Sequence, residues 1–221
     1  MITNSQLFIC HYHEKTSDCS SHWHVTCGGG IVTSANAQKY RPKYLREDDK
    51  AFRALTSYTS ENGWIEFRRD ITGVEATSFF DKFGKNLGLS DGYKMQLTQD
   101  ETDPKENRHR RYQLLWRNIP VEGSEFTLHS RKDQLTTAQG RVVEALTIDV
   151  SKPIIETQAL AKALTDQKLT VNDFKGDAKL PKGTLLLTSM DGDFVNSSYR
   201  LAYTFDVYGK GEPLKIYVDA M

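Results

Sequence analysis

The residues best suited to metal or thiol chemistry lie in the first 27 positions of the chain. Thiolates and imidazoles are preferred zinc ligands, and this stretch holds all three cysteines and four of the six histidines: Cys10, Cys19, Cys27, His11, His13, His22 and His24. Structural zinc modules usually pair two cysteines about two to four residues apart, and no such pair occurs here. We therefore favour a poorly ordered, non-native or misassigned leader over a zinc site.

Peptidase chemistry has a stricter sequence requirement. An H-E-x-x-H zinc peptidase needs two histidines on one helix face and a glutamate as the base. The chain has a single His-Glu pair, His13-Glu14, and Ser17 stands where the second histidine is needed. We also expect no serine or cysteine nucleophile activated by a histidine and an acid. The sequence therefore predicts that this chain is not an enzyme.

His109 and His129 lie in predicted strands, where they could meet across a sheet as an acid–base pair. We favour ordinary sheet or surface histidines. The run KENRHRR, residues 105–111, could contact phosphate, but acidic residues surround it and it leads into a strand. We expect a solvated turn there.

Two further patterns have a structural and a functional interpretation. Trp64, Tyr112 and Trp116 could form a ligand platform, although aromatic residues at strand alternation are usually core. Asp191-Gly192-Asp193 begins like a calcium loop, but the rest of that motif is missing, so we predict a turn. We expect no cofactor and no metal site on this chain.

The composition narrows the class of protein. The chain has 221 residues, with 29 basic and 29 acidic side chains and a net charge of zero, which argues against a nucleic-acid binder. No apolar run approaches the roughly 18 residues of a membrane span. A signal peptide needs an apolar stretch of about 7–15 residues, and Leu7 to Cys10 is too short. We expect either a cytosolic protein or a chain that lacks its true N-terminus.

The clearest structural pattern runs from Arg108 to Val143. Tyr112, Leu114 and Trp116 alternate with polar residues, and Phe126 and Leu128 do so in a second run. The two runs are joined at 118–120, and a weaker third run follows a polar turn. Alternation of period two, broken by turn residues, predicts an antiparallel sheet with one buried face.

Helix-like spacing appears before this sheet and again after it. Residues 76–88 and 154–166 each carry an apolar stripe, and Gly88 suits a left-handed helix stop. A weaker helical spacing links Phe52, Leu55 and Tyr58. Short apolar or alternating runs predict further strands at 64–67, 93–97, 185–187, 199–207 and 214–218. We predict an α+β fold with two small units, each a helix packed on an antiparallel sheet, after an irregular tail at 1–40.

Several phrases resemble the pro-region of thermolysin-like zinc metalloproteases. Residues 41–150 resemble the fungalysin/thermolysin propeptide domain, and the resemblance rests on Arg110-Arg111-Tyr112-Gln113, Asn118 to Phe126, His129 and Gly140. Residues 151–221 resemble the PepSY domain, through the helix Glu156 to Leu164, the strand Arg200 to Tyr203, and Tyr217 to Ala220. The resemblance implies a cystatin-like helix-on-sheet fold for each unit.

The resemblance also implies a function. Such a propeptide acts as an intramolecular chaperone and an inhibitor of a secreted thermolysin-like protease, which would be the partner in cis or in trans. Zinc and calcium are then expected only in the catalytic domain, and the location is secreted or the cell envelope. Tyr217, Val218, Asp219 and Ala220 are expected nearest the protease. The alternative is a stand-alone PepSY-type binding module or an inhibitor that acts in trans.

Overall fold

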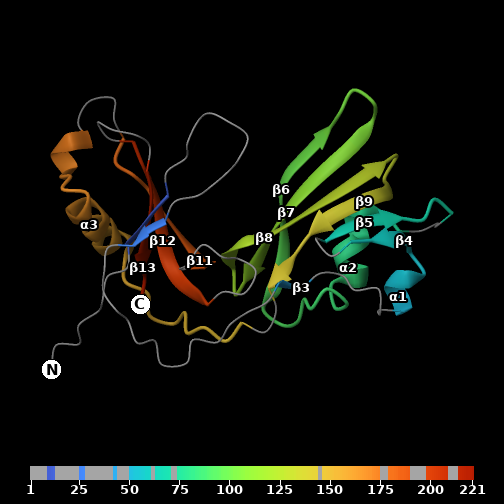
Figure 1. The fold of residues 1–221 in the computed structure, drawn as a ribbon, viewed down its shortest axis with the longest axis horizontal. Helices are drawn as coiled ribbons and strands as arrows, with labels where there is room; N and C mark the ends of the chain where they lie inside the picture. Colours follow the sequence, from blue (N-terminus) through green and yellow to red (C-terminus); the bar gives the residue numbers. More distant parts are fainter. Residues whose placement is uncertain are drawn as a thin grey trace. The chain divides into compact units, whose positions relative to one another are not determined.

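The computed structural model describes residues 9–12, 25–27, 42–43, 50–60, 63–70, 74–143, 146–174, 179–189, 198–208 and 214–221. Contacts divide the chain into two compact units, with the division at Leu146 and Thr147. The first unit is built on Tyr40–Leu146, and the second on the residues from Thr147 onward together with the N-terminal stretch. Figure 1 labels the helices and strands of both units.

The first unit is dominated by an antiparallel sheet with the strand order β6-β7-β8-β9-β5-β4. Its strands are β4 (Thr56–Thr59), β5 (Trp64–Phe67), β6 (Tyr93–Thr102), β7 (Asn107–Trp116), β8 (Ile119–Arg131) and β9 (Gln134–Gly140). A separate two-stranded sheet joins β3 (Pro42–Lys43) to β10 (Val142–Val143). The antiparallel sheet predicted over Arg108 to Val143 is confirmed.

Two tight turns set the register of this sheet. Arg117 and Asn118 have φ of 49° and 64°, and Lys132 and Asp133 have φ of 51° and 62°. Two consecutive residues with positive φ are typical of the turns that join hairpin strands. The predicted joint at 118–120 is therefore shorter than expected, because Ile119 already begins β8.

The helix predicted at 76–88 is wrong beyond Phe83. The structure has a 3₁₀ turn η1 (Ala76–Ser78) and a short helix α2 (Phe79–Phe83). After Phe83 the chain tightens, with backbone bonds from Leu87 to Gly84 and from Gly88 to Lys85. Glycine is a poor helix former, which explains an early end at Gly84, and Gly88 has the expected positive φ of 83°.

The helical spacing at Phe52, Leu55 and Tyr58 is also only partly realised. The helix α1 (Lys50–Arg53) ends before Leu55, and Tyr58 lies on β4. Three apolar residues at that spacing do not specify a helix when a strand follows at once.

The core of the first unit is an aromatic cluster between α2 and one face of the sheet. The ring centroids of Phe79 and Phe126 lie 6.0 Å apart, and those of Phe80 and Tyr112 lie 4.7 Å apart. Leu114 and Leu128, on β7 and β8, are fully buried with them. The even-numbered residues of β7 therefore face this core, as the alternation predicts.

The second unit contains an antiparallel sheet with the order β2-β1-β13-β12-β11. Its strands are β1 (Ile9–Tyr12), β2 (Val25–Cys27), β11 (Gly183–Ser189), β12 (Tyr199–Val207) and β13 (Leu214–Asp219). Within the irregular tail predicted at 1–40, the structure describes only these two short strands, β1 and β2. An unpaired strand edge on β13 offers backbone donors and acceptors, and β1 pairs with them.

The helix α3 (Glu156–Asp166) supplies the core of the second unit. Ala159, Leu160, Ala163 and Leu164 pack with Phe174 of η2 (Val171–Phe174) and with Phe205, Val207, Ile216 and Val218 of the sheet. This apolar stripe is the one predicted at 154–166. In addition, the carboxylate of Glu156 accepts a 2.7 Å hydrogen bond from the backbone N–H of Gly183.

Candidate functional site

His109 and His129 meet across β7 and β8. They are direct register partners, their Nδ1 atoms lie 2.6 Å apart, and their rings are nearly perpendicular, at 76°. Both side chains are partly exposed. Burial, and then the neighbouring His109, lower the pKa of His129. The structure therefore confirms that the two histidine side chains meet across the strands.

A polar row surrounds this histidine pair. Register pairing aligns Glu101, His109, His129, Thr137 and Glu66 on β6, β7, β8, β9 and β5. The carboxylate of Asp103 lies 3.7 Å from Nε2 of His109. The ring of Trp64 lies 6.3 Å from that of His129. The row therefore occupies the face of the sheet opposite the aromatic core.

Asp103 is held in place by the turn between β6 and β7. Its carboxylate accepts hydrogen bonds from the backbone N–H groups of Lys105 and Asn107, both at 2.8 Å, and from the Asn107 side chain at 2.9 Å. The bonds from Asn107 are the main cause that lowers the pKa of Asp103 to about 2. The carboxylate beside His109 is therefore charged at neutral pH.

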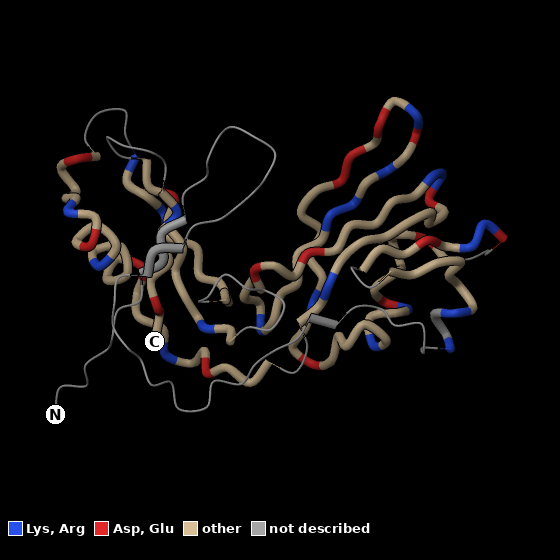
Figure 2. Tube along the Cα trace, in the orientation of Figure 1, with Lys and Arg blue, Asp and Glu red and all other residues tan. Residues whose placement is uncertain are grey.

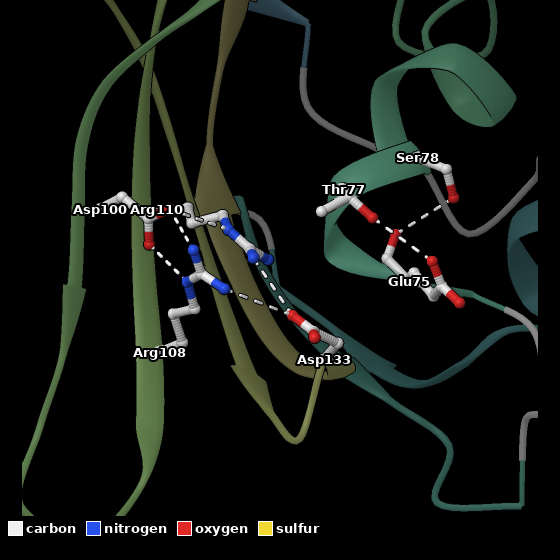
Figure 3. A network of polar contacts seen from close by, with 7 residues as sticks. All are labelled: Glu75, Thr77, Ser78, Asp100, Arg108, Arg110 and Asp133. Atoms are coloured by element: carbon white, nitrogen blue, oxygen red, sulfur yellow. Dashed lines mark hydrogen bonds and ion pairs between the residues drawn. The ribbon is translucent and has the colours of Figure 1, made fainter.

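A second polar cluster lies on the core face, beside η1 (Figure 3). Arg108 bonds the Asp100 carboxylate through two nitrogens, at 2.6 Å each, and this bond lowers the pKa of Asp100. Arg110 is 3% exposed and reaches both Asp100, at 3.4 Å, and Asp133, at 3.1 Å. Arg108 also lies 3.7 Å from Asp133. The cluster ties β6 and β7 to the turn between β8 and β9.

The basic run at 105–111 is therefore not a solvated turn throughout. Residues 107–111 belong to β7, and Arg110 is buried. Figure 2 shows acidic residues along β6 beside basic residues along β7. These are pairs of opposite charge across two strands, which contribute to sheet stability. Ion pairing with protein carboxylates, rather than with phosphate, accounts for Arg108 and Arg110.

The residues predicted to face a protease lie in the sheet of the second unit. Tyr217, Val218 and Ala220 are buried, and Asp219 makes a 3.2 Å ion pair with Arg200. Both edges of β13 are paired, one with β12 and the other with β1. Met221, at 44% exposed, is the accessible residue next to them. A partner that pairs with β13 on the β1 side would need to replace β1.

The cysteine- and histidine-rich leader is only partly described. Cys10 and Cys27 are register partners on β1 and β2. Cys19, His13, Glu14, His22 and His24 lie outside the described residues, as do Asp191, Gly192 and Asp193. Within the described ranges, no three His, Cys, Asp or Glu side chains form a metal-binding group.

The expectation of no activated serine rested on the absence of a G-x-S-x-G pattern, and that premise is wrong. Gly88-Leu89-Ser90-Asp91-Gly92 matches G-x-S-x-G, the pattern of a nucleophile elbow between a strand and a following helix. Here Ser90 is exposed in the turns between α2 and β6, so the order of elements is reversed. The motif alone carries no hydrolase site.

Trp64, Tyr112 and Trp116 do not form an exposed aromatic platform for a ligand. Tyr112 and Trp116 are buried in the core of the first unit, and burial raises the pKa of Tyr112. Trp64 is partly exposed beside His129.

Among the described helices, none has the length and apolar character to cross a membrane.

These features describe a mixed α/β scaffold whose largest sheet carries paired polar clusters. A family model described as the Fungalysin/Thermolysin Propeptide Motif matches residues 94–142. The comparison with curated proteins found no match. The matched segment begins in β6 and ends at Val142 of β10, so it contains both the histidine pair and the arginine–aspartate cluster.

Residues 94–142 therefore carry a propeptide domain of the fungalysin/thermolysin type. A propeptide of this kind implies a protease catalytic domain as its partner, and the family is one of secreted proteases. The match is narrower than the 41–150 expected from the sequence. The resemblance of 151–221 to PepSY stays a prediction.

Proposed function

We propose that this chain is the pro-region of a thermolysin-like zinc metalloprotease and acts as a chaperone and an inhibitor of the catalytic domain. The observation that carries the proposal is the propeptide motif at 94–142, which covers most of the main sheet of the first unit. The chain itself has no proteolytic activity in this proposal, and zinc catalysis belongs to the protease.

A rigid sheet suits this role. A folded scaffold that binds the native catalytic domain stabilises it by mass action, and a tether within one precursor raises the effective concentration of the scaffold. The arginine–aspartate cluster links two strands, β6 and β7, to the turn between β8 and β9 within the matched segment. It therefore supports a surface that keeps its shape before the partner has folded.

The C-terminal residues are proposed to contact the protease through their exposed groups. Because Tyr217, Val218 and Ala220 are buried, their replacement would disturb the fold before it reported on binding. Asp219 and Met221 are more accessible. Asp219→Ala and Met221→Ala are the informative variants, and Lys215→Ala, exposed on the same strand, is the matched control.

The direct test uses the purified chain and thermolysin as the probe. The chain is preincubated with the protease, and peptide hydrolysis is followed against its concentration. We expect inhibition at micromolar concentration or below, and no inhibition of subtilisin, a serine protease. A second assay measures the recovery of active thermolysin after denaturation, and the chain should increase it.

The outcome that contradicts the proposal is equally definite. If the chain neither inhibits nor helps to refold thermolysin or any protease in a panel of related enzymes, the proposed function is wrong. If inhibition occurs but is unchanged in Asp219→Ala and Met221→Ala, the pro-region function stands and the C-terminal contact is rejected.

A further inference from the structure

His109 and His129 bring two metal-ligating side chains into direct contact across β7 and β8. The two Nδ1 atoms point at each other over 2.6 Å, and the ring centroids lie 4.8 Å apart. A neutral imidazole carries one N–H and one free lone pair. In the absence of a metal ion, one ring donates a hydrogen bond to the other.

We propose that His109 and His129 form a cross-strand binding site for a divalent transition-metal ion of the zinc class, held through both Nδ1 atoms. Imidazole nitrogen is a preferred ligand of zinc, copper and nickel. Two residues directly opposite in an antiparallel pair hold their side chains close together, so the backbone already brings the two ligands together.

The surroundings of the pair fit metal binding. Ligating histidines usually donate their other ring nitrogen to a carboxylate, which orients the ring. Asp103 lies 3.7 Å from Nε2 of His109, and the turn that begins at Asp103 fixes that carboxylate. Glu101 pairs with His109, and Glu66 lies farther along the same row. These carboxylates favour a cation on this face.

The geometry requires only a small adjustment. Zinc–nitrogen bonds of about 2.0–2.1 Å in a tetrahedral site place two nitrogens roughly 3.3 Å apart. The rings must therefore separate by less than 1 Å from the 2.6 Å contact. No third protein ligand is available among the described residues, so water completes the coordination. The exposed fraction of the His109 side chain, 40%, leaves room for an ion to enter.

The test uses the full chain, reduced, with Zn²⁺ as the probe. Because the leader also contains cysteines and histidines, total zinc binding alone does not identify the site. Two-dimensional NMR of the imidazole groups in the unmodified chain resolves each histidine. The His109→Gln and His129→Gln variants assign the two signals, and circular dichroism checks that each variant is folded.

We expect Zn²⁺ to shift the His109 and His129 signals together. Either glutamine variant should weaken binding at the remaining histidine at least tenfold, and Asp103→Asn should weaken it by about tenfold. The double variant His22→Gln/His24→Gln, in the leader, is the control and should leave the shifts of His109 and His129 unchanged. Signals that do not move with Zn²⁺, or a single-histidine variant that binds as tightly, would overturn the site.

Discussion

Arg110 and Asp133 are joined by a 3.1 Å hydrogen bond from Nη2 on β7 to Oδ1 in the turn between β8 and β9. The two residues are 23 positions apart, and the arginine side chain is almost completely buried while the aspartate is half exposed. Asp100 of β6 accepts a 3.4 Å hydrogen bond from Nε of the same guanidinium. A buried cation between two carboxylates thus connects the elements that make up the propeptide-like sheet.

Replacement of Arg110 should destabilise the first unit. Arg110→Met removes the buried cation and leaves two carboxylates without it, and we expect a loss of about 2 kcal/mol in the free energy of unfolding. Arg108→Met is the matched control, because Arg108 is 41% exposed and exposed ion pairs contribute only about 0–1 kcal/mol. Urea unfolding measures both. Equal losses would contradict the special position of Arg110.

The same cluster predicts a loss of stability in acid. Arg108 lowers the pKa of Asp100 in the folded state, so the unfolded state binds a proton more readily than the folded state. The stabilisation is present above the unfolded pKa of about 4 and is lost as the pH falls through the lower folded pKa. Thermal midpoints measured across this window should fall less in Asp100→Asn than in the unmodified chain. Parallel curves would contradict the assignment.

The positive φ of Asn118 predicts that glycine at this position would raise the stability of the turn. Asn118 has a φ of 64°, a left-handed conformation that glycine adopts freely and that costs other residues about 1–2 kcal/mol. Asn118→Gly should therefore stabilise the β7–β8 hairpin slightly, whereas Asn118→Val should destabilise it by about 1–2 kcal/mol. Differential scanning calorimetry of the two variants measures both effects. A valine variant as stable as the glycine variant would contradict the turn geometry.

We predict that replacing Gly140 by any residue with a side chain destabilises the first unit. A Cβ atom there would lie 2.3 Å from Cδ2 of Phe126 and 2.7 Å from the Glu125 carbonyl oxygen. Phe126 is fully buried in the core and has little room to move, so Gly140→Ala should cost about 1–3 kcal/mol through overpacking. Gln139→Ala, at the exposed neighbouring position, is the control and should change little. Chemical denaturation that shows no difference between them would contradict this contact.

The sequence predicted most elements whose pattern is local. Alternation at Tyr112, Leu114 and Trp116 correctly predicted a strand with one buried face, because strand side chains point to opposite faces in turn. The stripe on α3 was equally reliable, since residues at helical spacing share one face. The helix predicted at 76–88 was shorter in the structure because Gly84 interrupts a stripe that apolar spacing alone could not reject.

Pairing across long sequence separations was decided only by the tertiary structure. Alternation placed His109 and His129 on strands, but only the register of β7 and β8 brings their Nδ1 atoms together. The burial of Arg110 could not be predicted from its place in a basic run. A buried arginine needs carboxylate partners, and here β6 and the β8–β9 turn supply them. The pairing of β1 with β13 followed from a strand edge that exists only in the folded sheet. By itself, the sequence determined where the strongly alternating strands and their turns form. Side-chain partners depended on register, which forms only when the strands assemble.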